Sequence, residues 1–123
     1  MRYMLAILLN GIAELEYDRE KPLDPNQATY IDDMDTKMDR SGVVLGEIKI
    51  PNPTDDEKYQ FVASNLYYSI KADNEGMAAA MVTYLAVRNP DLKQVKFSDK
   101  DEEVAIELVY DEKYTKQVAV KFN

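Results

Sequence analysis

Cysteine and histidine are both missing from this chain of 123 residues. Without cysteine there is no disulfide, no thiolate nucleophile and no cysteine-based metal site, and without histidine the commonest general base near neutral pH is gone. Together the two gaps remove the usual zinc ligands and both Ser-His and Cys-His catalysis. The sequence therefore predicts a protein that is not an enzyme and that needs no cofactor.

Sequence motifs of catalysis and nucleotide binding are missing as well. The chain has no P-loop, no G-x-G-x-x-G and no G-x-S-x-G. Its N-terminal apolar run over residues 3–9 superficially resembles a signal peptide, but Asn10 and Gly11 interrupt it. The run is also far shorter than the ~20 apolar residues that a transmembrane helix needs. We therefore expect a cytoplasmic protein without membrane contact.

Basic residues are scarce relative to acidic ones. The chain has 15 Lys and Arg against 23 Asp and Glu, a net charge of -8, which repels a nucleic-acid backbone at long range. Residues 14–57 hold 13 of the acids and five bases. A field concentrated there steers a basic protein partner, or it serves only to keep a small protein in solution.

The first part of the chain predicts two helices that form an antiparallel hairpin. Over residues 3–17 apolar side chains recur at spacings of three and four, which is typical of a helix, although a buried strand over residues 3–9 is the competing interpretation. Asp24 before a proline is typical of a helix N-terminus, so we expect a second helix over residues 25–40, ended by Ser41-Gly42. Its inward positions are Ala28, Ile31, Met34 and Met38.

Two further helices are predicted in the middle of the chain. Thr54 and Glu57 form a capping-box pattern that opens a third helix, and Asn89-Pro90 ends a fourth helix that follows the turn 73–76. The residues expected to face the core are Tyr59, Val62, Leu66 and Ile70 on the third helix, and Met77, Met81, Tyr84 and Leu85 on the fourth.

Alternating apolar and polar residues in the last part of the chain predict three strands joined by short polar turns. Their apolar positions are Val95 and Phe97, then Val104, Ile106, Leu108 and Tyr110, then Val118, Val120 and Phe122. Residues 43–50 fit either a fourth short strand or an extended arm. The predicted fold is α+β, a single domain over residues 1–123 in which about four N-terminal helices pack on a C-terminal three-stranded antiparallel β-meander.

The stretch YIDDMDTKMDR, residues 30–40, places four aspartates on the second predicted helix. At 100° per residue, Asp32, Asp35 and Asp39 lie within about 60° of one another and form an acidic ridge, whereas Asp33 points elsewhere and can pair with Lys37. The ridge could bind a hard cation, present charge to a basic partner, or simply be solvated.

A metal site on the ridge needs ligands that the ridge does not supply. Its spacing is not that of a calcium loop, and a straight helix cannot wrap three of its own carboxylates around one ion. A further carboxylate from the first predicted helix, Glu14, Glu16 or Asp18, would be required. We therefore predict no metal, with Asp32 and Asp35 as weak candidates.

Tyrosine is abundant, with nine residues in a chain that has no tryptophan. Tyr67 and Tyr68 follow the predicted core residue Leu66, and because successive helical residues diverge by about 100°, at least one of the pair should lie near the surface. Tyrosine is enriched at interfaces, although a tyrosine at the edge of the core with its hydroxyl in water is the simpler alternative.

The function predicted from these observations is a non-catalytic protein-interaction or regulatory domain. Its partner is a protein with a basic surface or a second copy of the chain, with no direct contact to nucleic acid. The predicted partner-binding residues are Asp32, Asp35, Asp39, Tyr67 and Tyr68. Two alternatives stay open: an acidic nucleic-acid mimic that blocks the basic groove of a nuclease or DNA-binding protein, and a small Mg²⁺- or Ca²⁺-dependent carboxylate enzyme.

Overall fold

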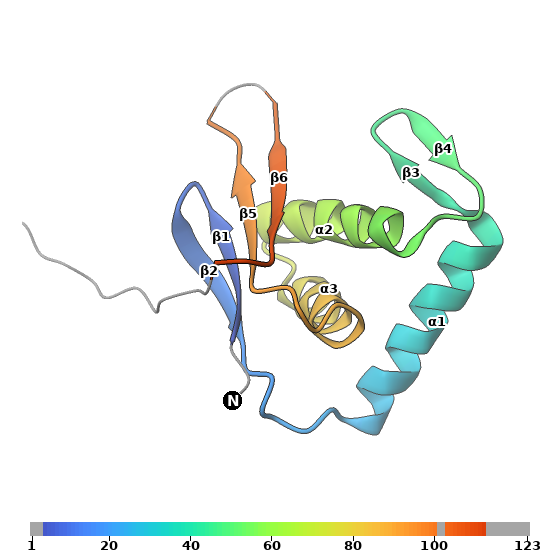
Figure 1. Ribbon diagram of the computed structural model, residues 1–123, viewed down its shortest axis with the longest axis horizontal. Helices are drawn as coiled ribbons and strands as arrows, with labels where there is room; N and C mark the ends of the chain where they lie inside the picture. Colours follow the sequence, from blue (N-terminus) through green and yellow to red (C-terminus); the bar gives the residue numbers. More distant parts are fainter. Residues whose placement is uncertain (1–3, 101–102, 113–123) are drawn as a thin grey trace, which may run out of the picture. The chain divides into compact units, whose positions relative to one another are not determined.

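The computed structural model describes residues 4–100 and 103–112, which form helices and strands in two compact units (Figure 1). The strands are β1 (Leu5–Leu9), β2 (Ile12–Tyr17), β3 (Val43–Leu45), β4 (Ile48–Ile50), β5 (Gln94–Ser98) and β6 (Ala105–Val109). The helices are α1 (Pro25–Ser41), α2 (Asp55–Lys71) and α3 (Glu75–Arg88). We call residues 20–91 the helical unit and the residues before and after them the sheet unit. That they make up a single domain stays a prediction.

The sheet unit is a four-stranded mixed sheet in the order β2-β1-β5-β6. β1 pairs with β2 antiparallel and with β5 parallel, and β6 pairs with β5 antiparallel (Figure 1). The strand β1, which has a partner on each edge, is a continuous apolar run whose first four residues are all buried. The edge strand β2 alternates between more and less exposed residues, the period of a strand with one solvated face.

The helix predicted over residues 3–17 is wrong, because this segment is the hairpin of β1 and β2. Asn10 and Gly11, with φ of 52° and 83°, form the turn, and this dipeptide favours the tight two-residue connection of a hairpin. The competing interpretation, a strand over residues 3–9, is the one that the structure supports at Leu5–Leu9, and residue 3 lies outside the described residues. The predicted hairpin of two helices is wrong for the same reason, and Ile12, expected in its apolar stripe, is exposed.

Asn10 also fastens this turn to the end of β5. Its side chain donates to Asp99 Oδ1 at 2.8 Å and accepts from the Asp99 backbone N–H at 3.0 Å, while its own backbone N–H donates to the carbonyl of Phe97. The predicted strands around Val95 and Ile106 are confirmed as β5 and β6. The third strand predicted around Val118 lies outside the described residues.

In the helical unit α1 and α2 begin where the sequence predicts, whereas α3 begins at Glu75, inside the predicted turn 73–76. The Asp24 side chain accepts from the backbone N–H of Asn26 and Pro25 is the first helical residue of α1, which ends at Ser41 before Gly42. In α2 the Thr54 hydroxyl accepts from the Glu57 backbone N–H and the Glu57 carboxylate accepts from the Thr54 N–H, so the predicted capping box is confirmed.

Residues 43–50 form their own two-stranded sheet rather than a fourth strand of the main sheet. β3 and β4 pair antiparallel across a turn at Gly46-Glu47, which gives each strand a partner next to it in the sequence. The predicted α+β class holds, but the arrangement of four helices on a three-stranded meander is wrong. The structure has three helices, a mixed four-stranded sheet and a separate two-stranded sheet among the described residues.

Within the helical unit, α2 packs on both α3 and β3, and α1 packs on α3. Ile31 of α1, Leu66 of α2 and Leu85 of α3 are fully buried or nearly so, as the sequence predicts. Met77 is the exception among the predicted core residues of α3, because its side chain is 42% exposed. None of the helices in the described ranges combines the length and apolar character that crossing a bilayer requires.

Gly42 and Gly46 allow a matched test of what fixes the β3-β4 sheet. Both have positive φ, but a Cβ on Gly42 would lie 2.5 Å from the Ile50 carbonyl oxygen, whereas a Cβ on Gly46 meets nothing within 4 Å. We expect Gly42→Ala to lower the free energy of unfolding by more than ~2 kcal/mol and Gly46→Ala by ~1 kcal/mol, because only the first adds a clash to the backbone strain. Urea denaturation measures both, and equal losses would contradict the assigned contact.

Candidate functional site

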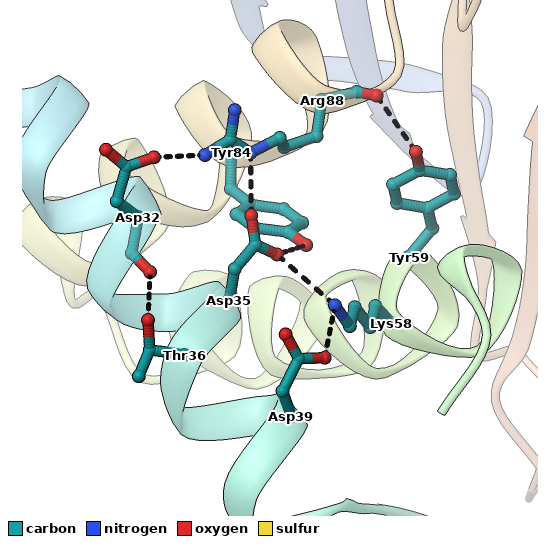
Figure 2. A network of polar contacts seen from close by, with 8 residues as sticks. All are labelled: Asp32, Asp35, Thr36, Asp39, Lys58, Tyr59, Tyr84 and Arg88. Carbon is teal, nitrogen blue, oxygen red and sulfur yellow. Dashed lines mark hydrogen bonds and ion pairs between the residues drawn. The ribbon is translucent and has the colours of Figure 1, made fainter. Parts of the chain in front are cut away.

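The three ridge aspartates lie on one side of α1, as the sequence predicts, and that side faces α2 and α3 within the helical unit (Figure 2). Asp35 is at the centre. One of its oxygens accepts from the Tyr84 hydroxyl at 2.5 Å, and the other accepts from Arg88 Nε at 2.7 Å. Lys58 Nζ lies 3.8 Å from the first oxygen. A single carboxylate therefore contacts three donors from the other two helices.

The two remaining ridge residues complete this cluster from either side. Asp32 accepts a hydrogen bond from Arg88 Nη2, and Asp39 pairs with Lys58 Nζ at 2.7 Å. Tyr59 of α2 donates its hydroxyl hydrogen to the backbone carbonyl of Arg88 at 2.9 Å, which holds the end of α3. We call these residues the ion cluster: Asp32, Asp35, Asp39, Lys58, Tyr84 and Arg88.

The surroundings of the ion cluster keep its donors protonated. The hydrogen bond to Asp39 raises the pKa of Lys58 against a smaller opposing effect of burial. Burial, followed by the hydrogen bond to Asp35, raises the pKa of Tyr84 far above its ordinary value. For Arg88, burial acts to lower the pKa, but hydrogen bonds to Asp32 and Asp35 outweigh it, so the pKa is raised.

These shifts bear on what the ion cluster can do chemically. For Lys58 or Tyr84 to act as a general base near neutral pH its pKa would have to be lowered, and here the pKa of each is raised. Three carboxylates against two cations leave the ion cluster with a formal charge of −1. The arrangement thus suits fixed charges that hold helices together.

The weak metal candidates Asp32 and Asp35 point toward cationic side chains. The carboxylates expected to assist them, Glu14 and Glu16, lie on β2 and not on a helix. Within residues 4–100 and 103–112 no group of three acidic side chains is arranged to hold a metal ion.

The predicted tyrosine pair is divided between core and surface. Tyr67 is 7% exposed and Tyr68 is 61% exposed, and their rings meet edge to face with centroids 5.1 Å apart. The prediction that at least one of them lies near the surface is confirmed. The hydrogen bonds and ion pairs described above for the acidic ridge lead to Lys58, Tyr84 and Arg88.

A groove between α1 and α3 is the feature that sequence reasoning missed. Its volume is about 410 Å³, and side chains of α1 and the first half of α3 line it. Tyr30 of α1 and Met77 of α3 are its large apolar residues, 45% and 42% exposed, and Gly76, Ala79 and Ala80 line the α3 side. Tyr30 lies next to the predicted core residue Ile31, and Met77 fits the core spacing of α3, so neither pattern indicated an exposed groove.

Comparison of the chain with protein-family models, with curated proteins and with solved structures finds no match in any of the three.

Asp35 and Asp33 provide a matched pair for measuring what the ion cluster contributes to stability. Asp35→Ala leaves the Tyr84 hydroxyl and Arg88 Nε without their acceptor and removes one of the two carboxylates near Lys58, so we expect a loss of about 2–4 kcal/mol in the free energy of unfolding. Asp33→Ala, on the exposed side of the same helix, should change it by less than about 0.5 kcal/mol. Urea denaturation provides the measurement, and similar losses for both variants would argue against the central role of Asp35.

Alkaline pH tests the buried hydroxyl of Tyr84. Because folding raises its pKa, its contribution to stability is complete below the unfolded value of about 10 and is lost as the pH rises toward the folded value. Above pH 10 the free energy of unfolding, measured by urea denaturation, should fall by up to about 1.4 kcal/mol per pH unit more for the wild type than for Tyr84→Phe. Tyr68→Phe, at an exposed position, should keep the wild-type slope, and identical slopes for all three proteins would exclude the assignment.

Proposed function

We propose that the chain is a non-catalytic protein-interaction or regulatory domain that contacts its partner through the groove between α1 and α3. The observation that carries the proposal is the groove itself, about 410 Å³ with Tyr30 and Met77 exposed at it. Aromatic residues and methionine are enriched at protein interfaces, and an exposed apolar patch on a small protein often marks an interaction site. Methionine also adapts its shape to the surface that it meets.

The helices on both sides of the groove are fixed before any partner arrives. The ion cluster ties α1 to α2 and α3, and its member Tyr84 of α3 is only 1% exposed. A surface that is already ordered loses little conformational freedom on binding, so more of the contact energy goes into affinity. This supports a binding role for the groove.

The acidic ridge keeps a secondary place in the proposal. Its carboxylates are paired with Lys58 and Arg88, which reduces the charge that the ridge offers to a partner. Asp32 and Asp39 nevertheless keep side chains that are 71% and 61% exposed, so they can still attract a basic protein. The same pairing weakens the nucleic-acid-mimic alternative, which needs unpaired carboxylates. The proposal retains the cytoplasmic location expected from the sequence.

Affinity capture from native lysate tests the proposed surface. The baits are the wild type, a Tyr30→Ser/Met77→Ser variant, and a Tyr68→Ser/Val44→Ser control that removes two comparably exposed apolar side chains elsewhere. We expect that at least one protein is captured by both the wild type and the control, and that the captured amount is lower by about tenfold or more with the groove variant. Two central interface residues commonly carry that much affinity. Quantitative mass spectrometry of the captured proteins gives the ratio.

Circular dichroism melts establish that each bait is folded. Capture that is unchanged by the groove variant contradicts the proposal. Loss with the Tyr68 control would instead return the site to the tyrosine pair of α2. Loss only with Asp32→Lys/Asp39→Lys, accompanied by loss at high salt, would return it to the acidic ridge.

A further inference from the structure

We propose that the groove between α1 and α3 accepts an amphipathic helix of net positive charge, at least two turns long, from a protein partner. This inference rests on the proposed function and names the chemistry of the partner. It is carried by the shape of the groove and by the charges beside it.

The shape of the groove suits a helix. Its α3 side extends over residues 76–83, about 12 Å at 1.5 Å per residue, which matches two turns of a partner helix. Gly76, Ala79 and Ala80 keep this side thin, and a Cβ built on Gly76 would meet only Asn74 Oδ1, at 4.0 Å. A partner helix can therefore approach the α3 backbone closely, with apolar anchors spaced at three, four and seven residues between Tyr30 and Met77.

The charges beside the groove are acidic. Asp33 lies three residues after Tyr30 and seven after Asn26, so it continues the face of α1 that lines the groove. Glu75 lies four residues before Ala79 on α3. Both carboxylates are exposed, and within the described part of the chain neither forms an ion pair, including the pair of Asp33 with Lys37 that the sequence predicts. Lys37 is the cation on the same face, one turn further along α1.

The charge of the whole helical unit favours the same partner. Residues 20–91 contain 13 acidic and seven basic residues, a net charge of −6. A second copy of the chain brings the same negative charge, and like charges brought together at an interface are unfavourable. A basic helix instead gains steering at long range and pairs with Asp33 and Glu75 at the edge of the contact.

Selection from a display library tests the inference. The library consists of 16-residue helix-forming peptides with eight randomised positions at which Lys, Arg, Asp and Glu are equally represented. It is selected on the wild type and counter-selected on Ala79→Trp, which fills the groove from an exposed position of α3. We expect the enriched peptides to carry apolar residues at positions i, i+3, i+4 and i+7 and a net positive charge.

Fluorescence anisotropy of the most enriched peptide gives its affinity for each variant. Ala79→Trp should weaken binding at least tenfold, Asp33→Asn/Glu75→Gln about threefold, and Gln60→Trp, which adds the same indole at an exposed position of α2, should leave it unchanged. Enriched peptides that are acidic, neutral or without helical spacing overturn the inference, as does equal binding to wild type and Ala79→Trp.

The combined results of the lysate capture and the peptide selection separate this inference from the proposed function. If lysate proteins need the groove but the enriched peptides are not basic, the proposed function stands and the basic helix falls. If capture from lysate is unchanged by Tyr30→Ser/Met77→Ser and the peptides bind Ala79→Trp as well as the wild type, both fall. Analytical ultracentrifugation tests whether a second copy of the chain occupies the groove. A wild-type dimer that becomes a monomer in Ala79→Trp would assign the groove to that second copy and overturn the inference.

Discussion

The carboxylate of Asp35 joins the three helices of the helical unit. It accepts hydrogen bonds from Tyr84 and Arg88 of α3 and lies 3.8 Å from Lys58 of α2 (Figure 2). α1 buries only Ile31 and Met38 completely, so apolar packing by itself fixes this helix weakly. The ion cluster therefore has a large share in setting where α1 lies, because its buried members Lys58 and Tyr84 need the carboxylates of α1 as partners.

The groove between α1 and α3 also depends on the contacts of Asp35 that position α1. The ion cluster holds the middle of α1 against the second half of α3, whereas the first half of α3 lines the groove with the small residues Gly76, Ala79 and Ala80 beside Met77. Side chains of that size do not fill the space beside Tyr30 and Met77. If α1 moved inward to fill it, the hydrogen bonds of Asp35 would break, so the groove stays open at the expense of buried apolar surface.

The parts of this fold that the sequence predicts correctly depend on interactions between residues that are close together in the sequence. The capping box of Thr54 and Glu57 and the proline after Asp24 act within a single turn of helix. Asn10-Gly11 is an equally local signal for a hairpin, which the helical interpretation did not use, and apolar residues at spacings of three and four also occur by chance across two adjacent strands. The parallel pairing of β1 with β5 joins segments more than 80 residues apart, and no local pattern encodes it.

In the candidate site, too, the sequence predicts the local geometry but not the contacts between distant residues. Helical geometry places Asp32, Asp35 and Asp39 on one side of α1, but it does not reveal that Lys58 and Arg88, 23 and 53 residues from Asp35, meet them there. Once those cations neutralise most of the ridge, the exposed carboxylates of Asp33 and Glu75 remain without an ion pair beside the groove among the described residues, with Lys37 one turn further along α1. Apolar surface and unpaired acidic charge thus coincide on one side of the α1 and α3 pair, which is the arrangement of an interface with an apolar centre and a charged edge.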